Sequence, residues 1–242
     1  MPDTRTHRGP HPEDARLFAP EAWPVLQRST AELCWLLSRG YAATSALKLV
    51  GDRHQLTARQ RSAVERCACP AESRERREGR RVGPDRLAAR ALWIDGYNVL
   101  TTVEVALGGG VLLAACDGAY RDLASMHGTY RKVSETMPAL ELLGRAISGW
   151  GAATCTWFFD RPVGNSGRLK GIMEQLAGER GWAWRVELVQ NPDRILAEAD
   201  EIAATADSVV LDRCRLWCNL AREVIDRHVP EANVVPMAGA GG

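Results

Sequence analysis

Three apolar, strand-like segments of this chain each end in an aspartate, namely Asp95, Asp160 and Asp207. In an open parallel α/β sheet, ligands bind at the carboxyl ends of the strands, so these carboxylates are expected at one edge. Carboxylate oxygens are hard ligands that suit Mg²⁺ or Mn²⁺, and a group of like charges normally needs such a cation. A metal-activated water can attack phosphorus. The three aspartates therefore predict a Mg²⁺- or Mn²⁺-dependent catalytic site for phosphodiester hydrolysis.

Further polar residues are candidates for completing this site. Asp193, which follows Asn191 and Pro192, is expected as a further metal ligand, and Asn98 is expected to orient a ligand or a water. Other acidic candidates for the same position are Glu198, Asp200 and Asp117. The alternative interpretation is that the aspartates are ordinary turn residues and helix caps, for which aspartate is a preferred residue.

A polar, glycine-bearing loop follows Asp160 and leads into an expected helix around Leu169–Gly178. Backbone N–H groups at the start of a helix bind anions, so Ser166 and Arg168 are predicted to contact a substrate phosphate. The alternative interpretation is a capped helix start, with Asn165 or Ser166 as the N-cap residue.

The elements that must position these residues alternate between strands and helices from residue 91 onward, which indicates a parallel sheet covered on both faces. The expected strands are Ala91–Ile94, Thr154–Phe159, Ala183–Val189, Glu201–Ala206 and Asn233–Pro236. A hairpin of Val103–Leu107 and Val111–Ala115 is expected after the first strand, with a Gly-rich loop as the alternative. The last helix is expected at Val209–Val229. The predicted fold class is α/β, with a Rossmann-like parallel sheet.

The N-terminal part of the chain has a different pattern. Three helix candidates, with apolar residues mostly three and four positions apart, cover Glu21–Arg39, Ala42–Val50 and Leu56–Cys67. The sequence therefore predicts a disordered tail over residues 1–20, a small helical module over 21–69 and an α/β domain over 91–238. Residues 70–90 carry mixed charge and few apolar side chains, which favours an exposed charged linker or a solvated helix between the two.

Net charge is unevenly divided along the chain. Residues 1–90 hold 17 Arg and Lys against 11 Asp and Glu, a net of +6, and residues 91–242 hold 14 against 19, a net of −5. The two values sum to the overall +1. A basic module beside an acidic one favours contact with phosphates, and RNA is the partner that we expect.

The chain has seven cysteines, an odd number, and no apolar run approaches the roughly 18 residues that would span a bilayer. We therefore expect reduced thiols, no contact with a membrane and a cytoplasmic protein. Cys67 and Cys69 lack the usual two-residue gap of zinc ligands, and so do Cys214 and Cys218, which favours buried packing over a zinc site. His127 is likewise expected to be structural rather than catalytic.

Short motifs in the C-terminal part resemble a known family. Asp95-Gly96-Tyr97-Asn98, after an apolar strand, is similar to the opening motif of the NYN nucleases, a branch of the PIN-like ribonuclease fold. Phe159-Asp160 and Ala204-Thr205-Ala206-Asp207-Ser208 resemble the later strand ends of that family. The resemblance spans residues 91–236 and implies a ribonuclease in which Asp95, Asp160 and Asp207 belong to the acidic, metal-binding site.

The N-terminal part resembles a second family. The segments Arg39-Gly40-Tyr41, Ala46–Leu56 and Arg59-Gln60-Arg61 are similar to domain of unknown function 434. That module is found joined to a C-terminal domain with the same Asp-Gly-Tyr-Asn motif. The resemblance implies an architecture and no particular reaction.

Two other functions stay open at this point. One is a non-catalytic nucleic-acid-binding or regulatory protein, because the PIN-like pattern expects an acidic residue on a helix before the last strand end. The spacing from Asp200 to Asp207 leaves no room for such a helix. The other is an enzyme that acts on a small phosphate ester at the same acidic site.

Overall fold

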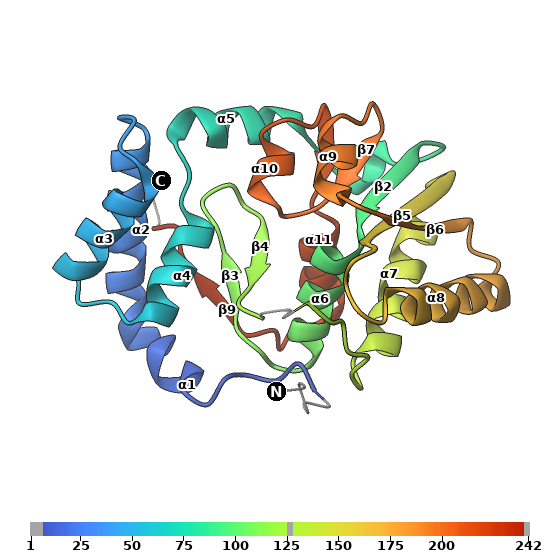
Figure 1. The fold of residues 1–242 in the computed structure, drawn as a ribbon, viewed down its shortest axis with the longest axis horizontal. Coiled ribbons are helices and arrows are strands. Elements are labelled where there is room, and N and C mark those ends of the chain that lie inside the picture. Colours follow the sequence, from blue (N-terminus) through green and yellow to red (C-terminus); the bar gives the residue numbers. More distant parts are fainter. Residues whose placement is uncertain (1–6, 125–127, 240–242) are drawn as a thin grey trace.

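The structure is a computed structural model that describes residues 7–124 and 128–239. The larger of its two sheets, in the right-hand part of Figure 1, has six strands, and all neighbouring strands run parallel. Its strands, in spatial order, are β1 (Arg81–Val82), β8 (Leu216–Cys218), β7 (Ile202–Ala204), β2 (Ala91–Asp95), β5 (Thr154–Asp160) and β6 (Trp184–Val189). The predicted α/β class is confirmed, and the arrangement is consistent with a Rossmann-like sheet.

Helices cover both faces of this sheet. The helices on one face are α6 (Gly96–Leu107), α7 (Thr136–Gly149), α8 (Ser166–Arg180) and α11 (Leu220–His228). The helices on the other face are α9 (Pro192–Ala197) and α10 (Ser208–Leu211). Leu92 and Ile94 of β2 face the first group, and Trp93 between them packs with the second. This alternation is expected because successive side chains of a strand point to opposite faces.

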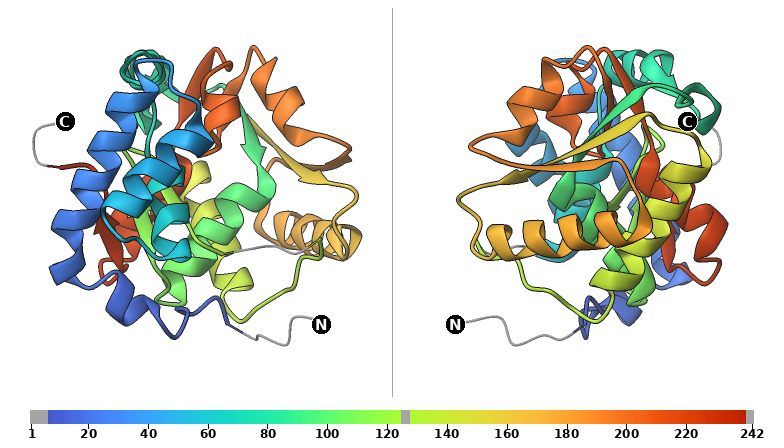
Figure 2. Two further views of the ribbon diagram at one scale, coloured as in Figure 1. Left: turned by 60° about the vertical axis from the view of Figure 1, so that its left-hand side comes forward. Right: turned by 90° about the vertical axis from the view of Figure 1, so that its right-hand side faces the viewer.

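A second, three-stranded sheet joins the α/β part to the N-terminal helices. Its strands, in spatial order, are β4 (Tyr120–Asp122), β3 (Leu112–Ala114) and β9 (Val234–Pro236). The helices on its outer side, blue in Figure 2, are α2 (Trp23–Leu37), α3 (Ala43–Arg53) and α4 (Ala58–Cys67). Leu112 lies in the core of the α/β part, whereas Leu113 and Val235 lie in the core of the helices. The two parts therefore share this sheet, and the predicted N-terminal helical region is confirmed.

Helices also occur in the segments predicted as tail and linker. Near the N-terminus, α1 (Asp14–Leu17) precedes a 3₁₀ helix, η1 (Pro20–Ala22), and residues 1–6 lie outside the described residues. Between the two main parts, α5 (Ala71–Arg80) precedes β1 and a second 3₁₀ helix, η2 (Pro84–Arg86). The domain boundaries that we expected stay predictions. No helix in residues 7–124 and 128–239 combines the length and apolar character needed to cross a membrane.

Two expectations about element type were wrong. Val103–Leu107 is the C-terminal end of α6 rather than a hairpin strand, in a helix that is buried on nearly every side. Leu216–Cys218 forms β8 and divides the single helix expected over Val209–Val229 into α10 and α11. The physical reason is common to both. A buried helix and a short buried strand are both continuous apolar runs, which periodicity does not separate.

A buried carboxylate on α6 holds the N-terminal segment against the α/β part. Glu104 is fully buried, and its Oε2 accepts a hydrogen bond from Arg8 Nε at 3.0 Å. The hydroxyl groups of Tyr130 and Thr136 donate to its Oε1. Burial raises the pKa of Glu104, and these donors oppose that rise. The ion pair places Arg8, within the predicted tail, in the middle of the fold.

A second buried carboxylate joins three separate parts of the chain. Asp117, in the turn between β3 and β4, accepts from Arg77 Nη1 of α5 at 2.6 Å and from Arg121 Nη2 of β4 at 2.7 Å. Arg77 also donates to Asp212 at 2.8 Å. Burial alone would raise the pKa of Asp117, but the two guanidinium groups hold it below its usual range.

The Asp117→Ala variant tests how much the ion pairs of Asp117 contribute to the stability of the fold. It leaves Arg121 buried without a carboxylate partner, so we expect the free energy of unfolding to fall by about 3–5 kcal/mol. Asp200→Ala, the control, removes an exposed aspartate paired with exposed Arg215 and should leave stability unchanged within error. Urea unfolding followed by circular dichroism measures both. Equal midpoints for the two variants would show that the buried pairs do not stabilise the fold.

Candidate active site

The carboxyl ends of β2 and β7 form a topological switch point of the large sheet. From β2 the chain continues to β5 on one side, and from β7 it continues to β8 on the other. Connections that leave two neighbouring strands in opposite directions open a crevice, where ligands of α/β sheets bind. Asp95 ends β2, and Asp207 follows β7 after two residues. The sheet order thus brings the first and the last predicted site aspartates to the same crevice.

Asp95 is buried at this edge of the sheet, where uncharged donors hold it. It is 8% exposed. Its Oδ2 accepts from the hydroxyl of Thr205 at 2.8 Å, and its Oδ1 accepts from the backbone N–H of Asn98 at 3.3 Å, as the N-cap of α6. Thr205 was not among the predicted site residues. Its signal was its place two residues before Asp207, on the segment that follows β7.

Asn98 bridges the crevice. Its side-chain Oδ1 accepts from the backbone N–H of Ala206 at 2.8 Å, which ties the first turn of α6 to the loop after β7. The sequence predicted that Asn98 orients a ligand or a water, and it gave no sign of this contact with Ala206. The contact takes up the amide oxygen, and among the described residues the Nδ2 atom makes no hydrogen bond. It remains a donor for a ligand in the crevice.

The other three candidates are more exposed than Asp95. Asp160 is half-buried at the end of β5, the neighbour of β2 on its other side. Asp193 is exposed in the first turn of α9. Asp207 is half-buried and caps α10, accepting from the backbone N–H groups of Val209 and Val210 at 2.8 and 3.2 Å. The interpretation as helix caps therefore holds for Asp95 and Asp207, in addition to their place at the crevice.

The four carboxylates act on one another electrostatically. Burial, followed by the charges of Asp193 and Asp207, raises the pKa of Asp95 to about 7, against the donors that lower it. Desolvation and the charges of Asp207 and Asp160 raise the pKa of Asp193. Within residues 7–124 and 128–239, none of the four forms an ion pair with Lys, Arg or His. The site is therefore a set of neighbouring carboxylates without a compensating cation.

The donor set fits a hard divalent cation in chemistry, because it consists of carboxylate, hydroxyl and amide oxygens. In the part of the chain that the structure describes, however, no three His, Cys, Asp or Glu side chains converge closely enough to hold a metal ion. Binding one ion would need side-chain rotation, which the more open positions of Asp160 and Asp193 allow. The other acidic candidates, Asp117, Asp200 and Glu198, are engaged in ion pairs with Arg121, Arg215 and Arg194.

The glycine and tyrosine of the Asp-Gly-Tyr-Asn motif have packing roles. A Cβ at Gly96 would lie 2.4 Å from the Phe159 ring, so only glycine allows β5 to approach the start of α6. Tyr97 packs edge-on against Phe159 and beside Tyr130, with ring centroids 4.8 and 5.4 Å away. Its hydroxyl is buried and has no hydrogen-bond partner among the described residues, and desolvation and the charge of Asp160 raise its pKa. It is thus a protonated donor near the acidic site.

The loop after Asp160 is paired with residues 128–130. Thr129 and Gly164 form a parallel bridge, and the N–H of Tyr130 donates to Gly164 O at 3.0 Å. Asn165 takes the left-handed conformation, with φ of 69°, and its Nδ2 donates to Tyr130 O at 3.0 Å. It stands at the N-cap position of α8 but makes no capping bond. Ser166 is buried and donates to Arg161 O at 3.5 Å.

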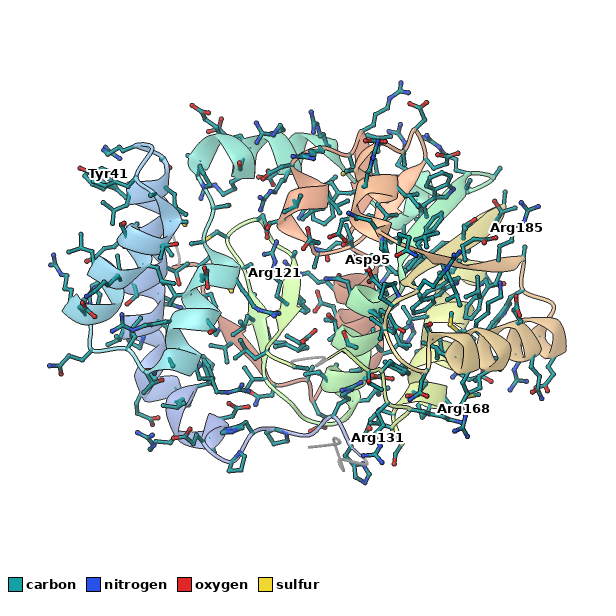
Figure 3. The ribbon with its side chains drawn as sticks, in the orientation of Figure 1. Tyr41, Asp95, Arg121, Arg131, Arg168 and Arg185 are labelled. Carbon is teal, nitrogen blue, oxygen red and sulfur yellow. The ribbon has the colours of Figure 1, made fainter. Side chains whose placement is uncertain are left out.

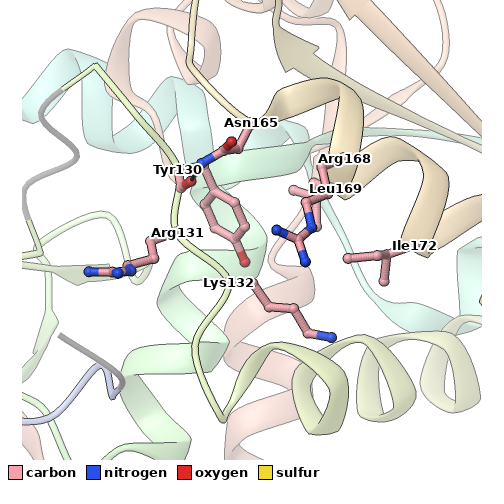
Figure 4. Close-up of a pocket in the computed structure, with 7 residues that line it drawn as sticks. All are labelled: Tyr130, Arg131, Lys132, Asn165, Arg168, Leu169 and Ile172. Atoms are coloured by element: carbon pink, nitrogen blue, oxygen red, sulfur yellow. Dashed lines mark hydrogen bonds between the residues drawn. The ribbon is translucent and has the colours of Figure 1, made fainter. Parts of the chain in front are cut away.

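A pocket of about 350 Å³ opens at this end of α8 (Figure 4). Its lining residues are Tyr130, Arg131, Lys132, Asn165, Arg168, Leu169 and Ile172. Among the described residues, the side chains of Arg131, Lys132 and Arg168 make no ion pair. In Figure 4, Lys132 and Arg168 extend along the same side of the pocket, and the Arg131 guanidinium extends away from them. In the view of Figure 3, the pocket's arginines, Arg131 and Arg168, lie below Asp95.

Sequence reasoning found Arg168 and missed Lys132. The basic pair Arg131-Lys132 was visible, but only the Thr129–Gly164 bridge, which joins residues 35 positions apart, places it beside α8. His127, in the same segment, lies outside the described residues.

Comparisons with known proteins decide the family. The model of the family described as Domain of unknown function (DUF5616) matches residues 84–223, more than half of the chain. The chain belongs to this family. A second model, described as Protein of unknown function (DUF434), matches residues 25–80 and agrees with the resemblance of the N-terminal motifs. The chain is also 24% identical to "Uncharacterized protein MJ0935" of Methanocaldococcus jannaschii over 190 residues, which cover 77% of this chain and 88% of that protein. No solved structure matches it.

The two matched segments meet at the structural features described above. The DUF5616 segment contains the four aspartates, the pocket and Asp117. The DUF434 segment contains α3, α4 and α5, and with α5 it contributes Arg77, which binds Asp117. The buried ion pair thus connects the two family segments.

The titration of Asp95 predicts the pH dependence of stability in the metal-free protein. The folded-state pKa of about 7 exceeds the ordinary 3.8, so folding favours the protonated carboxyl, and this stabilisation is lost as the pH rises through about 7. Asp95→Asn keeps an oxygen acceptor and removes the titration. Relative to wild type, we expect it to gain on the order of a few kcal/mol between about pH 5 and about pH 9. Chemical unfolding in the presence of a chelator measures this, with Asp200→Asn as control. Parallel pH profiles for Asp95→Asn and wild type would contradict the burial of an uncompensated carboxyl.

Proposed function

We propose that the chain is a Mg²⁺- or Mn²⁺-dependent phosphodiesterase that cleaves RNA, with a PIN/NYN-like active site on its DUF5616 segment. The observation that carries the proposal is the buried carboxyl of Asp95 at the switch point. Its pKa is raised to about 7, partly by the charges of Asp193 and Asp207, and among the described residues these aspartates pair with no cation. A buried carboxylate without a positive partner destabilises the fold. A fold can carry this cost at a site where a bound ligand supplies the positive charge.

Asp95, Asp160 and Asp207 would hold the metal, with Asp193 as a further ligand. When bound, a divalent ion makes water a stronger nucleophile and offsets charge on the phosphate oxygens. The chain's own groups set the conditions. Asp95 has to be ionised, which favours a pH at or above its pKa of about 7. Thr205 and the Asn98 N–H fix the orientation of its carboxyl.

Three features support a phosphate-bearing polymer as the substrate. The Tyr97 hydroxyl is a buried donor near the charge of Asp160, and no described residue accepts a hydrogen bond from it. The pocket at the start of α8 offers Lys132 and Arg168 with no carboxylate among its lining residues. Ser166 was predicted to contact phosphate, but its hydroxyl faces Arg161 O, so within this proposal it supports the loop and Arg168 carries the charge. Two cations on the same DUF5616 segment as the acidic site suit a backbone that continues past the cleaved phosphate.

A second candidate function is nucleic-acid binding without cleavage. It is favoured by the finding that no three metal-ligand side chains converge among the described residues. The cationic pocket and the basic N-terminal part would serve it equally well. The two functions differ in whether Asp95 is needed.

Cleavage of a labelled single-stranded RNA in Mn²⁺ separates them. Asp95→Asn should lower the cleavage rate at least about 100-fold, because it removes the central ligand, while the fold stays intact at the same pH. Asp193→Asn should have a smaller effect, and Asp200→Asn should cleave like wild type. Equal cleavage rates for wild type and Asp95→Asn would contradict the catalytic proposal. Salt-dependent binding without cleavage by wild type selects the second candidate.

The pocket is tested by RNA affinity as a function of salt. Lys132→Gln and Arg168→Gln should each reduce the slope of log affinity against log salt by about 0.7, the value for one phosphate contact of a single strand. Arg28→Gln is the matched control, because Arg28 is exposed and belongs to α2, which stands at the opposite end of the molecule from α8 (Figure 1). If the slope falls only for Arg28→Gln, RNA binds the N-terminal helices rather than the pocket.

A further inference from the structure

Four cysteines gather where the N-terminal helices meet the turn between β3 and β4. Cys34 lies in α2, Cys67 ends α4, Cys69 follows two residues later, and Cys116 lies in the turn. The Sγ atoms of Cys34 and Cys116 are 3.6 Å apart, and the N–H of Cys116 donates to Cys67 O at 3.0 Å. The group draws on both family segments. No metal-holding group was found among the described residues, so we consider thiol oxidation rather than metal binding for these sulfurs.

Cys34 differs from the other six cysteines in its ionisation. The hydrogen bond between the Cys34 and Cys116 thiols, with further support from the Cys69 backbone and Arg74, lowers the pKa of Cys34 to about 7, although burial opposes this. Desolvation raises the pKa of Cys67, Cys69, Cys155 and Cys218 to about 12 and that of Cys214 to about 11. The pKa of Cys116 is raised, because its thiol shares a proton with Cys34. Cys34 is also only half-buried. A half-buried thiolate of this kind is a reactive one.

We propose that Cys34 and Cys116 are an oxidation site, at which a peroxide converts the two thiols into a disulfide. The thiolate of Cys34 attacks one peroxide oxygen, the O–O bond breaks, and Cys34 becomes a sulfenic acid while hydroxide leaves. Cys116 Sγ then attacks Cys34 Sγ, the S–O bond breaks, and the oxygen leaves as water with the proton of the Cys116 thiol. The two sulfurs lose two electrons in total, and these reduce the peroxide.

The geometry allows the bond with a small movement. The sulfurs must approach from 3.6 Å to about 2.05 Å, which side-chain rotation at two half-buried positions can supply. The bond would join residues 82 positions apart and would fasten α2 to the turn that carries Asp117. It would thereby lock the DUF434 segment to the DUF5616 segment. The reduced thiols expected from the sequence are the resting state of this site, and the proposal does not depend on the proposed nuclease function.

The first test uses the wild-type full chain and needs no variant. The reduced protein is treated with hydrogen peroxide, denatured and alkylated, and its peptides are mapped. We expect alkylatable thiols to fall from seven to five, since one disulfide removes two, and the linked peptides to contain Cys34 and Cys116. The thermal midpoint should rise by on the order of 10 °C, as closing a long loop stabilises the fold. A disulfide to Cys67 or Cys69, or sulfinic acid at Cys34 without a disulfide, overturns the proposal.

Variants identify the two roles. Cys116→Ser should abolish the disulfide and accumulate sulfenic acid at Cys34, which dimedone traps. Cys34→Ser should abolish both products. Cys155→Ser, at a buried position in the α/β core, is the matched control and should form the disulfide like wild type. Unchanged disulfide formation in Cys34→Ser overturns the proposal, and so does stoichiometric zinc in the purified wild-type chain that is lost in both Cys34→Ser and Cys116→Ser.

Discussion

The contact on which most of the structure depends is the buried carboxylate of Asp117 between Arg77 and Arg121. Arg77 comes from α5 and Arg121 from β4, so one carboxylate joins the N-terminal part to the small sheet. Arg121 Nε also donates to Ala206 O at 2.9 Å, in the residue before Asp207. The backbone of Arg77 accepts from Trp217 Nε1 of β8. Through these bonds the turn, α5, the edge of the large sheet and the loop of the acidic site are held in one relative position. Removing a partner from such a network leaves a charge in a place that water does not reach, which is why buried pairs of this kind are costly to break.

Asp95 shows what the same burial does without cations. Asp95 and Asp117 are 8% and 5% exposed, yet the pKa of Asp117 is lowered and that of Asp95 is raised. The difference lies in their partners, two guanidinium groups for Asp117 against a hydroxyl and a backbone N–H for Asp95. The chain has arginines close to this region, since Arg121 reaches the backbone of Ala206, and still none pairs with an aspartate of the crevice among the described residues. This contrast between a buried carboxylate that two arginines satisfy and one that no cation satisfies among the described residues is the physical basis of the proposed cation site.

Local sequence patterns predicted the parts of the fold that local physics determines. The three N-terminal helices follow from apolar residues at helical spacing, and Thr57 and Gln60 form a capping box at the start of α4. The strand ends at Asp95 and Asp160 follow from apolar runs. The local patterns did not predict features that depend on residues far apart in the sequence. Arg77 stands in a charged run typical of solvent, but its partner Asp117 is 40 positions away. Leu216–Cys218 becomes a strand only because β7 and β1 lie beside it. Lys132 joins Arg168 only through the bridge from Thr129 to Gly164.

The shared small sheet explains why the helical part cannot be treated as a separate attachment. Side chains of β3 alternate between the two cores, with Leu112 on one side and Leu113 on the other, so unfolding of the helices would expose one face of a strand whose other face supports α6. The start of α6 carries Asp95 as its cap and Asn98 in its first turn. Two routes of contact connect the small sheet with the acidic site, one through β3 to α6 and one through Arg121 of β4 to Ala206. Cys34 and Cys116 lie on the helical side of this sheet, where a bond between them would restrain both routes. The proposed disulfide would therefore join elements that also contact the first turns and the loop of the acidic site.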